Sequence, residues 1–218
     1  MSGRYVKILY LLIIALSLQS CMTTPPESPD NICKIFKEKK SWYKAAIQAE
    51  KRWKIPPYVL MSFVFQESSY RANAKPERDK LLGFIPWFRP SSAKGYSQAL
   101  TKTWDDYMDE TGNSRAKRNN FKDSTDFIGW YASKGYYQGF EKADARSLYL
   151  AYHEGYGGFE KRTYRKKQWL IAVSDRVQAR SSMYQQQYWG CADDLKKRRA
   201  GIKQQFKQRK DGKYRLMF

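Results

Sequence analysis

Residues 57–70 read PYVLMSFVFQESSY, an apolar stretch with a single charged residue. Pro57 suits the first turn of a helix, where the missing amide hydrogen of proline costs nothing. On that helix Glu67 shares one face with three apolar residues that precede it by seven, four and three positions, Leu60, Phe63 and Val64. We therefore predict a helix that runs to about Ser69 and carries Glu67 on the stripe that faces the core.

A glutamate on an apolar helix face is a candidate general acid. Half-burial against apolar neighbours disfavours the charged carboxylate and raises its pKa. Glycosidases use such a shift to keep their acid protonated near neutral pH. The alternative is a glutamate near the helix end that bends out to solvent or caps a neighbouring group, and spacing alone leaves both interpretations of Glu67 open.

The other helices are predicted from caps, breakers and apolar spacing. We expect a helix capped by Ser41 that ends before Pro56, and further helices over residues 98–110, 123–137, 144–154 and 167–188. Because strand signals are few, the chain is predicted to be mostly α. Its 218 residues, 16% of them aromatic, suit one domain with a sizeable core and exclude disorder for the bulk of the chain.

The N-terminus resembles a bacterial lipoprotein signal. Two basic residues precede an apolar run over residues 8–18 that is too short to span a bilayer. The run ends in the lipobox-like Leu-Gln-Ser-Cys of residues 18–21. This resemblance implies acylation of Cys21, and Met22 after it implies the periplasmic side of the outer membrane. The alternative is a buried amphipathic helix with an incidental cysteine.

A lipid-anchored chain divides into a signal peptide, a tether, a folded domain and a basic tail, over residues 1–20, 21–32, 33–195 and 196–218. Because the secreted compartment is oxidising, the two remaining cysteines, Cys33 and Cys191, are predicted to form a disulfide. The tail contains ten Lys or Arg and one acid. It is either an amphipathic arm that binds an anionic surface or a solvated helix face with a frayed end.

Three segments resemble, in the right order, the motifs of the soluble lytic transglycosylase family. Residues 66–70 (QESSY) resemble E-S-x-F/Y, which carries the catalytic glutamate of that family. Residues 95–98 (GYSQ) are similar to G-L-M-Q, and residues 151–155 (AYHEG) are similar to A-Y-N-x-G. The departures from the family pattern are Tyr96, Ser97 and His153, and a long segment between the first two motifs.

The resemblance implies a lysozyme-like domain that cleaves the β-1,4 bond between N-acetylmuramic acid and N-acetylglucosamine in peptidoglycan. Glu67 would protonate the glycosidic oxygen. As a carboxylate it would then take the proton of the muramoyl C6 hydroxyl, which closes on C1 and gives a 1,6-anhydro end. The reaction needs no cofactor and no metal. The substrate-binding residues implied are Ser68, Tyr96, Gln98, Tyr152 and His153.

Ordinary glycosidases cleave the glycosidic bond with two carboxyl groups about 5 to 9.5 Å apart. In this sequence Glu154 is the only plausible second acid beside Glu67. We interpret Glu154 as a helix-end residue, which leaves Glu67 as the sole acid and base. A hydrolytic lysozyme of the same fold and a non-catalytic wall-binding lipoprotein remain alternatives.

The net charge of +20 indicates a polyanionic partner, which could be nucleic acid, an anionic membrane or an acidic polymer. Removal of the signal peptide leaves +18. A lipid-anchored periplasmic protein does not normally meet nucleic acid, so the predicted partners are peptidoglycan strands and the membrane. One His and three Cys exclude His-based zinc motifs and leave too few cysteines for a Cys₄ site, so we expect no metal chemistry. The sequence leaves the oligomeric state open.

Overall fold

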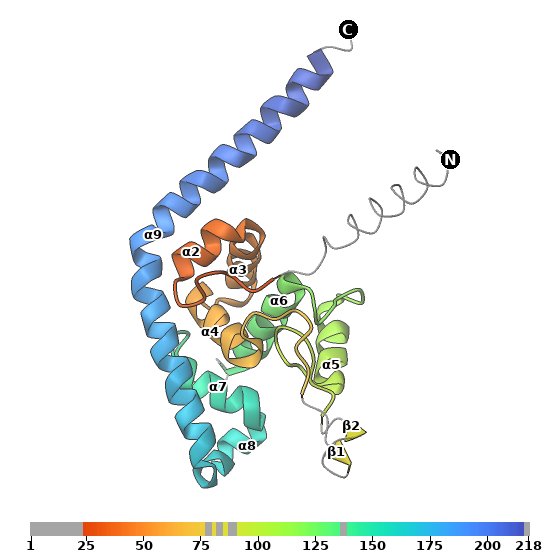
Figure 1. Ribbon diagram of the computed structural model, residues 1–218, viewed down its shortest axis with the longest axis vertical. Coiled ribbons are helices and arrows are strands. Elements are labelled where there is room, and N and C mark those ends of the chain that lie inside the picture. Colours follow the sequence, from red (N-terminus) through yellow and green to blue (C-terminus); the bar gives the residue numbers. More distant parts are fainter. Residues whose placement is uncertain (1–23, 77–79, 82–84, 87–90, 136–138, 216–218) are drawn as a thin grey trace, which may run out of the picture.

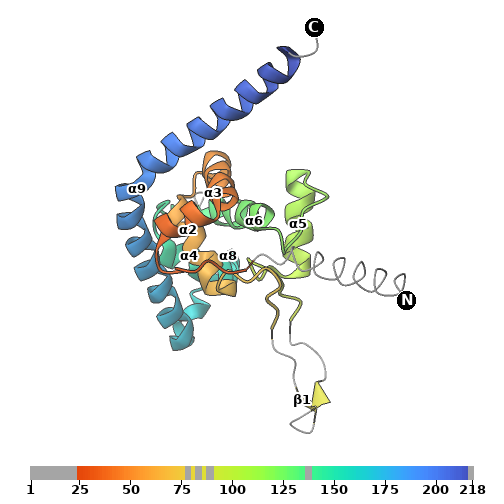
Figure 2. The same cartoon turned by 45° about the horizontal axis from the view of Figure 1, so that its top comes forward.

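In the computed structural model, the described residues are 24–76, 80–81, 85–86, 91–135 and 139–215. The predicted signal peptide and the predicted lipidation site Cys21 lie outside them. The helices are α2 (Ile32–Glu38), α3 (Lys40–Trp53), α4 (Pro57–Ser68), α5 (Thr101–Thr111), α6 (Phe121–Ser133), α7 (Ala145–Glu154), α8 (Tyr156–Glu160) and α9 (Gln168–Arg215), with a 3-10 turn over Thr163–Lys166. The antiparallel strands β1 (Lys80–Leu81) and β2 (Ile85–Pro86) form a short ribbon away from the helices (Figures 1 and 2). The domain is mostly α, as predicted.

Helix α4 lies in the centre of the domain. It begins with Pro57, and the predicted core-facing residues Leu60, Phe63 and Val64 have no exposed surface. Helices α3, α6 and α9 pack around it, and α9 runs along one side of the domain across α4 and α7 (Figure 1). The helix that carries Glu67 is therefore held from several directions.

Helix α9 ties the beginning of the domain to its end. A disulfide joins Cys33 to Cys191, with 6.1 Å between the Cα atoms, in agreement with the predicted pairing. Arg180 on α9 forms an ion pair with Asp30 at 2.6 Å, and the hydroxyl of Tyr184 donates to the carbonyl of Pro29. The last part of the predicted tether therefore lies against the domain.

The C-terminal part of α9 continues the helix without a break at the predicted boundary after residue 195. Leu195 is buried, whereas the described side chains that follow it, Lys196, Lys197 and Ala200, are exposed. Figure 1 shows this end of the helix extending away from the other helices. Within the described ranges, no helix has the length and apolar character needed to cross a membrane.

Several predicted helix boundaries are wrong. Helix α6 begins at Phe121 rather than at residue 123, because Asn120 caps it. Ser41 does not cap α3, which begins at Lys40 directly after α2; the side-chain cap nearby is Asn31, whose Oδ1 accepts the amide of Lys34 at 2.9 Å. Helix α5 begins at Thr101 rather than Gln98, because Gln98 has a left-handed φ of 47°. Helix α9 runs on to Arg215 instead of ending at residue 188.

Candidate active site

Glu67 lies in the last turn of α4, next to a sharp turn of the chain. Ser69 and Tyr70 follow it with φ values of 48° and 63°. The fully buried ring of Tyr70 packs against Trp42 with 5.6 Å between ring centroids, and its hydroxyl donates to the carbonyl of Met61 at 3.2 Å. A buried aromatic side chain therefore anchors the turn that presents Glu67.

Glu67 is partly exposed, and Tyr149 and Tyr152 of α7 lie close to its carboxyl group. Phe63, one turn earlier on α4, packs edge-on against Tyr149 and Tyr152 of α7, with centroid distances of 5.3 and 5.5 Å. Burial raises the pKa of Glu67 to about 7, and a hydrogen bond from Tyr149 acts in the opposite direction by favouring the carboxylate. Near neutral pH this group therefore exists in both protonation states.

Tyr149 is a site residue that the sequence analysis missed. It lies three positions before Tyr152, so both hydroxyls come from one face of α7. The resemblance implied Tyr152 as a substrate-binding residue and did not single out Tyr149, but the side chain hydrogen-bonded to Glu67 is Tyr149. The i, i+3 spacing of the two tyrosines is the signal that could have identified it.

Tyr152 instead joins the third motif to the second. Its hydroxyl donates to the carbonyl of Ser97 at 2.6 Å. Burial raises the pKa of Tyr152, and the negative charge of the nearby Glu67 adds to that rise. One tyrosine thus brings residues 95–98 close to the carboxyl of Glu67.

The backbone of residues 95–98 requires the glycine of that motif. Gly95 has a φ of 79°, and a Cβ at this position would lie 1.8 Å from the carbonyl oxygen of Arg118. The side-chain Nε2 of Gln98 donates to the carbonyls of Ala74 and Gly95 at 3.0 and 2.8 Å. Gln98 therefore bridges two loops, and its contact with sugar stays a prediction.

Two of the predicted substrate-binding residues are buried, and their contact with sugar stays a prediction. Tyr96 has no exposed surface, because its ring packs edge-on against Trp42 and Phe121 at 5.6 and 5.2 Å. Ser68 is 1% exposed, and its hydroxyl donates to the carbonyl of Val64 one turn back at 2.9 Å. Both side chains stabilise the fold beside the site.

His153 and Glu154 lie at the end of α7 and interact with each other at 3.2 Å. Burial opposes ionisation of Glu154, but hydrogen bonds from Lys167, Thr163 and His153 outweigh it and lower its pKa to about 2. Glu154 is therefore a carboxylate held by a lysine, which agrees with its interpretation as a helix-end residue. The His153 ring is exposed and packs edge-on against Trp169 at 5.1 Å.

The charge environment of Glu67 contains no second acid among the residues described. Only burial and Tyr149 shift its pKa. In the same part of the chain, no three His, Cys, Asp or Glu side chains gather closely enough to hold a metal ion. The chemistry that this arrangement can perform is proton donation and acceptance by one carboxyl group.

Comparison with known proteins agrees with this geometry. Neither a curated protein nor a solved structure matches the chain significantly. The sequence profile of the transglycosylase SLT domain matches residues 9–191, a range that holds all three motifs and every residue of the site. The chain, with Glu67 at the end of a buried helix, therefore belongs to the transglycosylase SLT domain family, whose members cleave peptidoglycan.

Proposed function

We propose that this protein is a lytic transglycosylase that cleaves the β-1,4 bond between N-acetylmuramic acid and N-acetylglucosamine. Glu67 first protonates the glycosidic oxygen. The resulting carboxylate then takes the proton of the muramoyl C6 hydroxyl as that oxygen bonds to C1, and a 1,6-anhydro end forms. Each cleavage returns Glu67 to its protonated form, so no water and no further proton source are consumed.

The observation that carries this proposal is the raised pKa of Glu67, about 7, together with its hydrogen bond from Tyr149. A group that must act first as an acid and then as a base works best when its pKa lies near the working pH. Burial supplies the protonated acid, and the Tyr149 hydroxyl stabilises the carboxylate that forms after proton transfer. Both halves of the proposed reaction therefore have a physical basis in one site.

The absence of a second acid around Glu67 among the described residues favours transglycosylation over hydrolysis. A hydrolase of the inverting or retaining kind needs a second carboxylate as base or nucleophile. Glu154 does not supply this second carboxylate, because it forms an ion pair with Lys167 at 2.7 Å. An internal hydroxyl of the substrate can replace water without such a group.

Mass analysis of muropeptides tests the proposal directly. Sacculi digested with the purified protein are expected to yield muropeptides with 1,6-anhydromuramoyl ends, each lighter by one water than the product of hydrolysis. Reducing ends would mean a hydrolytic lysozyme of the same fold. A protein that binds sacculi and releases no muropeptide would be a wall-binding module.

Tyr149→Phe is expected to slow cleavage about tenfold and to move its pH dependence. Loss of a hydrogen bond to the carboxylate removes a group that lowers the pKa of Glu67, so this pKa should rise above about 7. The acid form of Glu67 is needed for the first step, and activity falls as the pH rises through this pKa. The alkaline limb of kcat/KM should therefore lie at higher pH in the variant. Steady-state cleavage rates measured between about pH 5 and 9, the range in which such a group titrates, test this shift.

Tyr152→Phe is the matched control for this prediction. It also removes one phenolic hydroxyl from α7, but that hydroxyl bonds to Ser97 rather than to Glu67. Its alkaline limb should stay at the wild-type pH. A shift in Tyr152→Phe without a shift in Tyr149→Phe would contradict the assignment of Tyr149.

We also propose that the protein is anchored by a lipid on Cys21 at the periplasmic side of the outer membrane. This rests on the lipobox-like order of charge, apolar run and cysteine at the N-terminus. Labelling with palmitate followed by membrane fractionation tests it, with Cys21→Ala as the control. Unlabelled protein in the cytoplasmic fraction would contradict the anchor and reopen the nucleic-acid alternative.

A further inference from the structure

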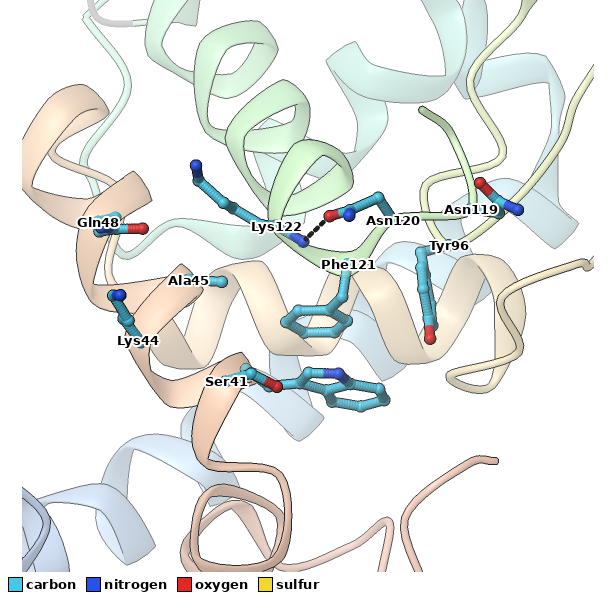
Figure 3. Close-up of a pocket in the computed structure, with 10 residues that line it drawn as sticks. Ser41, Lys44, Ala45, Gln48, Tyr96, Asn119, Asn120, Phe121 and Lys122 are labelled. Carbon is cyan, nitrogen blue, oxygen red and sulfur yellow. Dashed lines mark hydrogen bonds between the residues drawn. The ribbon is translucent and has the colours of Figure 1, made fainter. Parts of the chain in front are cut away.

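A second concave site lies between the beginnings of α3 and α6, and Figure 3 shows the residues that line it. Its volume is about 410 Å³, which falls within the range of small-ligand pockets. Its lining residues do not include Glu67, Tyr149 or Tyr152, and Tyr96 connects it along the chain to Ser97, which accepts the hydrogen bond of Tyr152. It is lined by Ser41, Trp42, Lys44, Ala45 and Gln48 from one side and by Tyr96, Asn119, Asn120, Phe121 and Lys122 from the other.

The floor of the pocket is a rigid aromatic cluster. Trp42 and Phe121 stack at 3.9 Å with an interplanar angle of 3°, and the ring of Tyr96 packs edge-on against both. Only 3% of Trp42 and 6% of Phe121 are exposed. A sugar ring needs an exposed aromatic face to stack on, so this floor does not favour a glycan ligand.

The rim of the pocket is polar and positively charged. Lys44 and Lys122 extend from the two helices that face each other across it (Figure 3), and both are exposed. Neither lysine forms an ion pair within the described part of the chain, and no Asp or Glu lines the pocket. Asp123, the acid next to Lys122 in the chain, instead accepts the amide of Lys117 at 2.9 Å.

Both lysines are exposed and available to a bound anion. Lys122 lies in the first turn of α6, where the helix dipole favours negative charge, and Lys44 lies in the second turn of α3. A bound anion would pair with these lysines and would lie at the end of α6 where its dipole favours negative charge. The exposed Ser41 hydroxyl and Gln48 amide add hydrogen-bonding groups of the kind that bind a peptide backbone.

We infer that this pocket binds a short acidic peptide, with Lys44 and Lys122 each facing a carboxylate. The identification of that peptide as the peptide stem of peptidoglycan rests on the proposed function. The stem carries several carboxylates on a short chain, which suits two lysines on opposite sides of a small pocket. Binding here would hold the wall substrate at a site beside the catalytic groove.

Binding is tested on the full protein carrying Glu67→Gln, so that no cleavage intervenes. Three probes are titrated by calorimetry: the stem tetrapeptide Ala-γ-Glu-diaminopimelate-Ala, the same peptide with its carboxylates amidated, and N-acetylmuramic acid. The tetrapeptide is expected to bind, and its amidated form is not. Binding of N-acetylmuramic acid as tight as that of the tetrapeptide would overturn the peptide assignment, as would no binding of the tetrapeptide.

Lysine substitutions locate the site. Lys44→Gln and Lys122→Gln are each expected to weaken tetrapeptide binding about threefold, and the double variant about tenfold, as is typical of exposed charge pairs. Lys102→Gln, an exposed lysine of α5 outside the pocket, is the matched control and should bind as before. Equal affinity of the double variant and its parent would overturn the site.

Cleavage assays separate this inference from the proposed function. The Lys44→Gln, Lys122→Gln double variant should cleave glycan strands without peptide stems at the wild-type rate and should digest stem-bearing sacculi more slowly. Equal effects on both substrates would overturn the inference. A wild-type protein that cleaves neither substrate but still binds the tetrapeptide would refute the proposed function and leave the peptide site standing.

Discussion

Glu67→Gln is expected to reduce peptidoglycan cleavage by at least about a thousandfold, because one carboxyl group supplies both proton transfers of the reaction. General acid–base catalysis by a placed side chain contributes about 10² to 10⁴ in rate. Glutamine keeps the shape of the side chain but cannot donate a proton to the glycosidic oxygen or accept one from the C6 hydroxyl. The release of muropeptides from sacculi, followed over time by mass analysis, measures the loss.

The variant should remain folded and should still bind sacculi. Replacement of a buried ionisable group by an uncharged one of the same size removes a desolvation cost, so the thermal midpoint should not fall. Glu154→Gln is the matched control, because its carboxylate is bound by Lys167 outside the proposed reaction, and its cleavage rate should stay near wild type. Full activity of Glu67→Gln would discard the assignment of the site.

Loss of the Cys33–Cys191 disulfide is expected to lower the free energy of unfolding by about 5 kcal/mol at most. The two cysteines are 158 positions apart, and the entropy of the unfolded chain lost by closing so long a loop corresponds to about this value. Urea unfolding of the Cys33→Ser, Cys191→Ser double variant, compared with the wild type, measures the difference.

Reduction of the wild-type protein provides an independent check of this loss. A reductant should lower the unfolding midpoint of the wild type to that of the double variant and leave the double variant unchanged. The network of Arg180 with Asp30 and of Tyr184 with Pro29 holds the same two parts of the chain together. A midpoint that neither the reductant nor the substitutions move would contradict the predicted contribution of the disulfide.

Helices whose signals are local were predicted closely. Helix α4 begins at Pro57, and α7 begins after Asp144, whose side chain accepts the amide of Ser147 at 2.9 Å. The C-terminal end of α9 was predicted too early because we placed it where the apolar stripe of the helix stops. Lys, Arg and Gln, which dominate the following segment, are good helix formers and continue the helix without a buried face.

The candidate site was predicted only in part. The spacing of Leu60, Phe63 and Val64 placed Glu67 beside the core, and the three motifs indicated the family. The motifs also led us to expect sugar contacts from Ser68 and Tyr96, both of which are buried. A motif identifies residues that lie near a site, but it does not distinguish a side chain that faces the groove from one that supports it.

The sequence therefore sufficed to identify the mostly α fold and the helix of Glu67, because helix periodicity and caps depend on residues close together along the chain. Its three motifs indicated the family. The partner of Glu67 depended on packing. Tyr149 and Tyr152 lie on one face of α7, and only the way α7 packs against α4 and residues 95–98 directs the first hydroxyl to the carboxyl and the second to Ser97. The pKa of Glu67 follows from the same packing, since desolvation depends on which side chains surround the carboxyl in space.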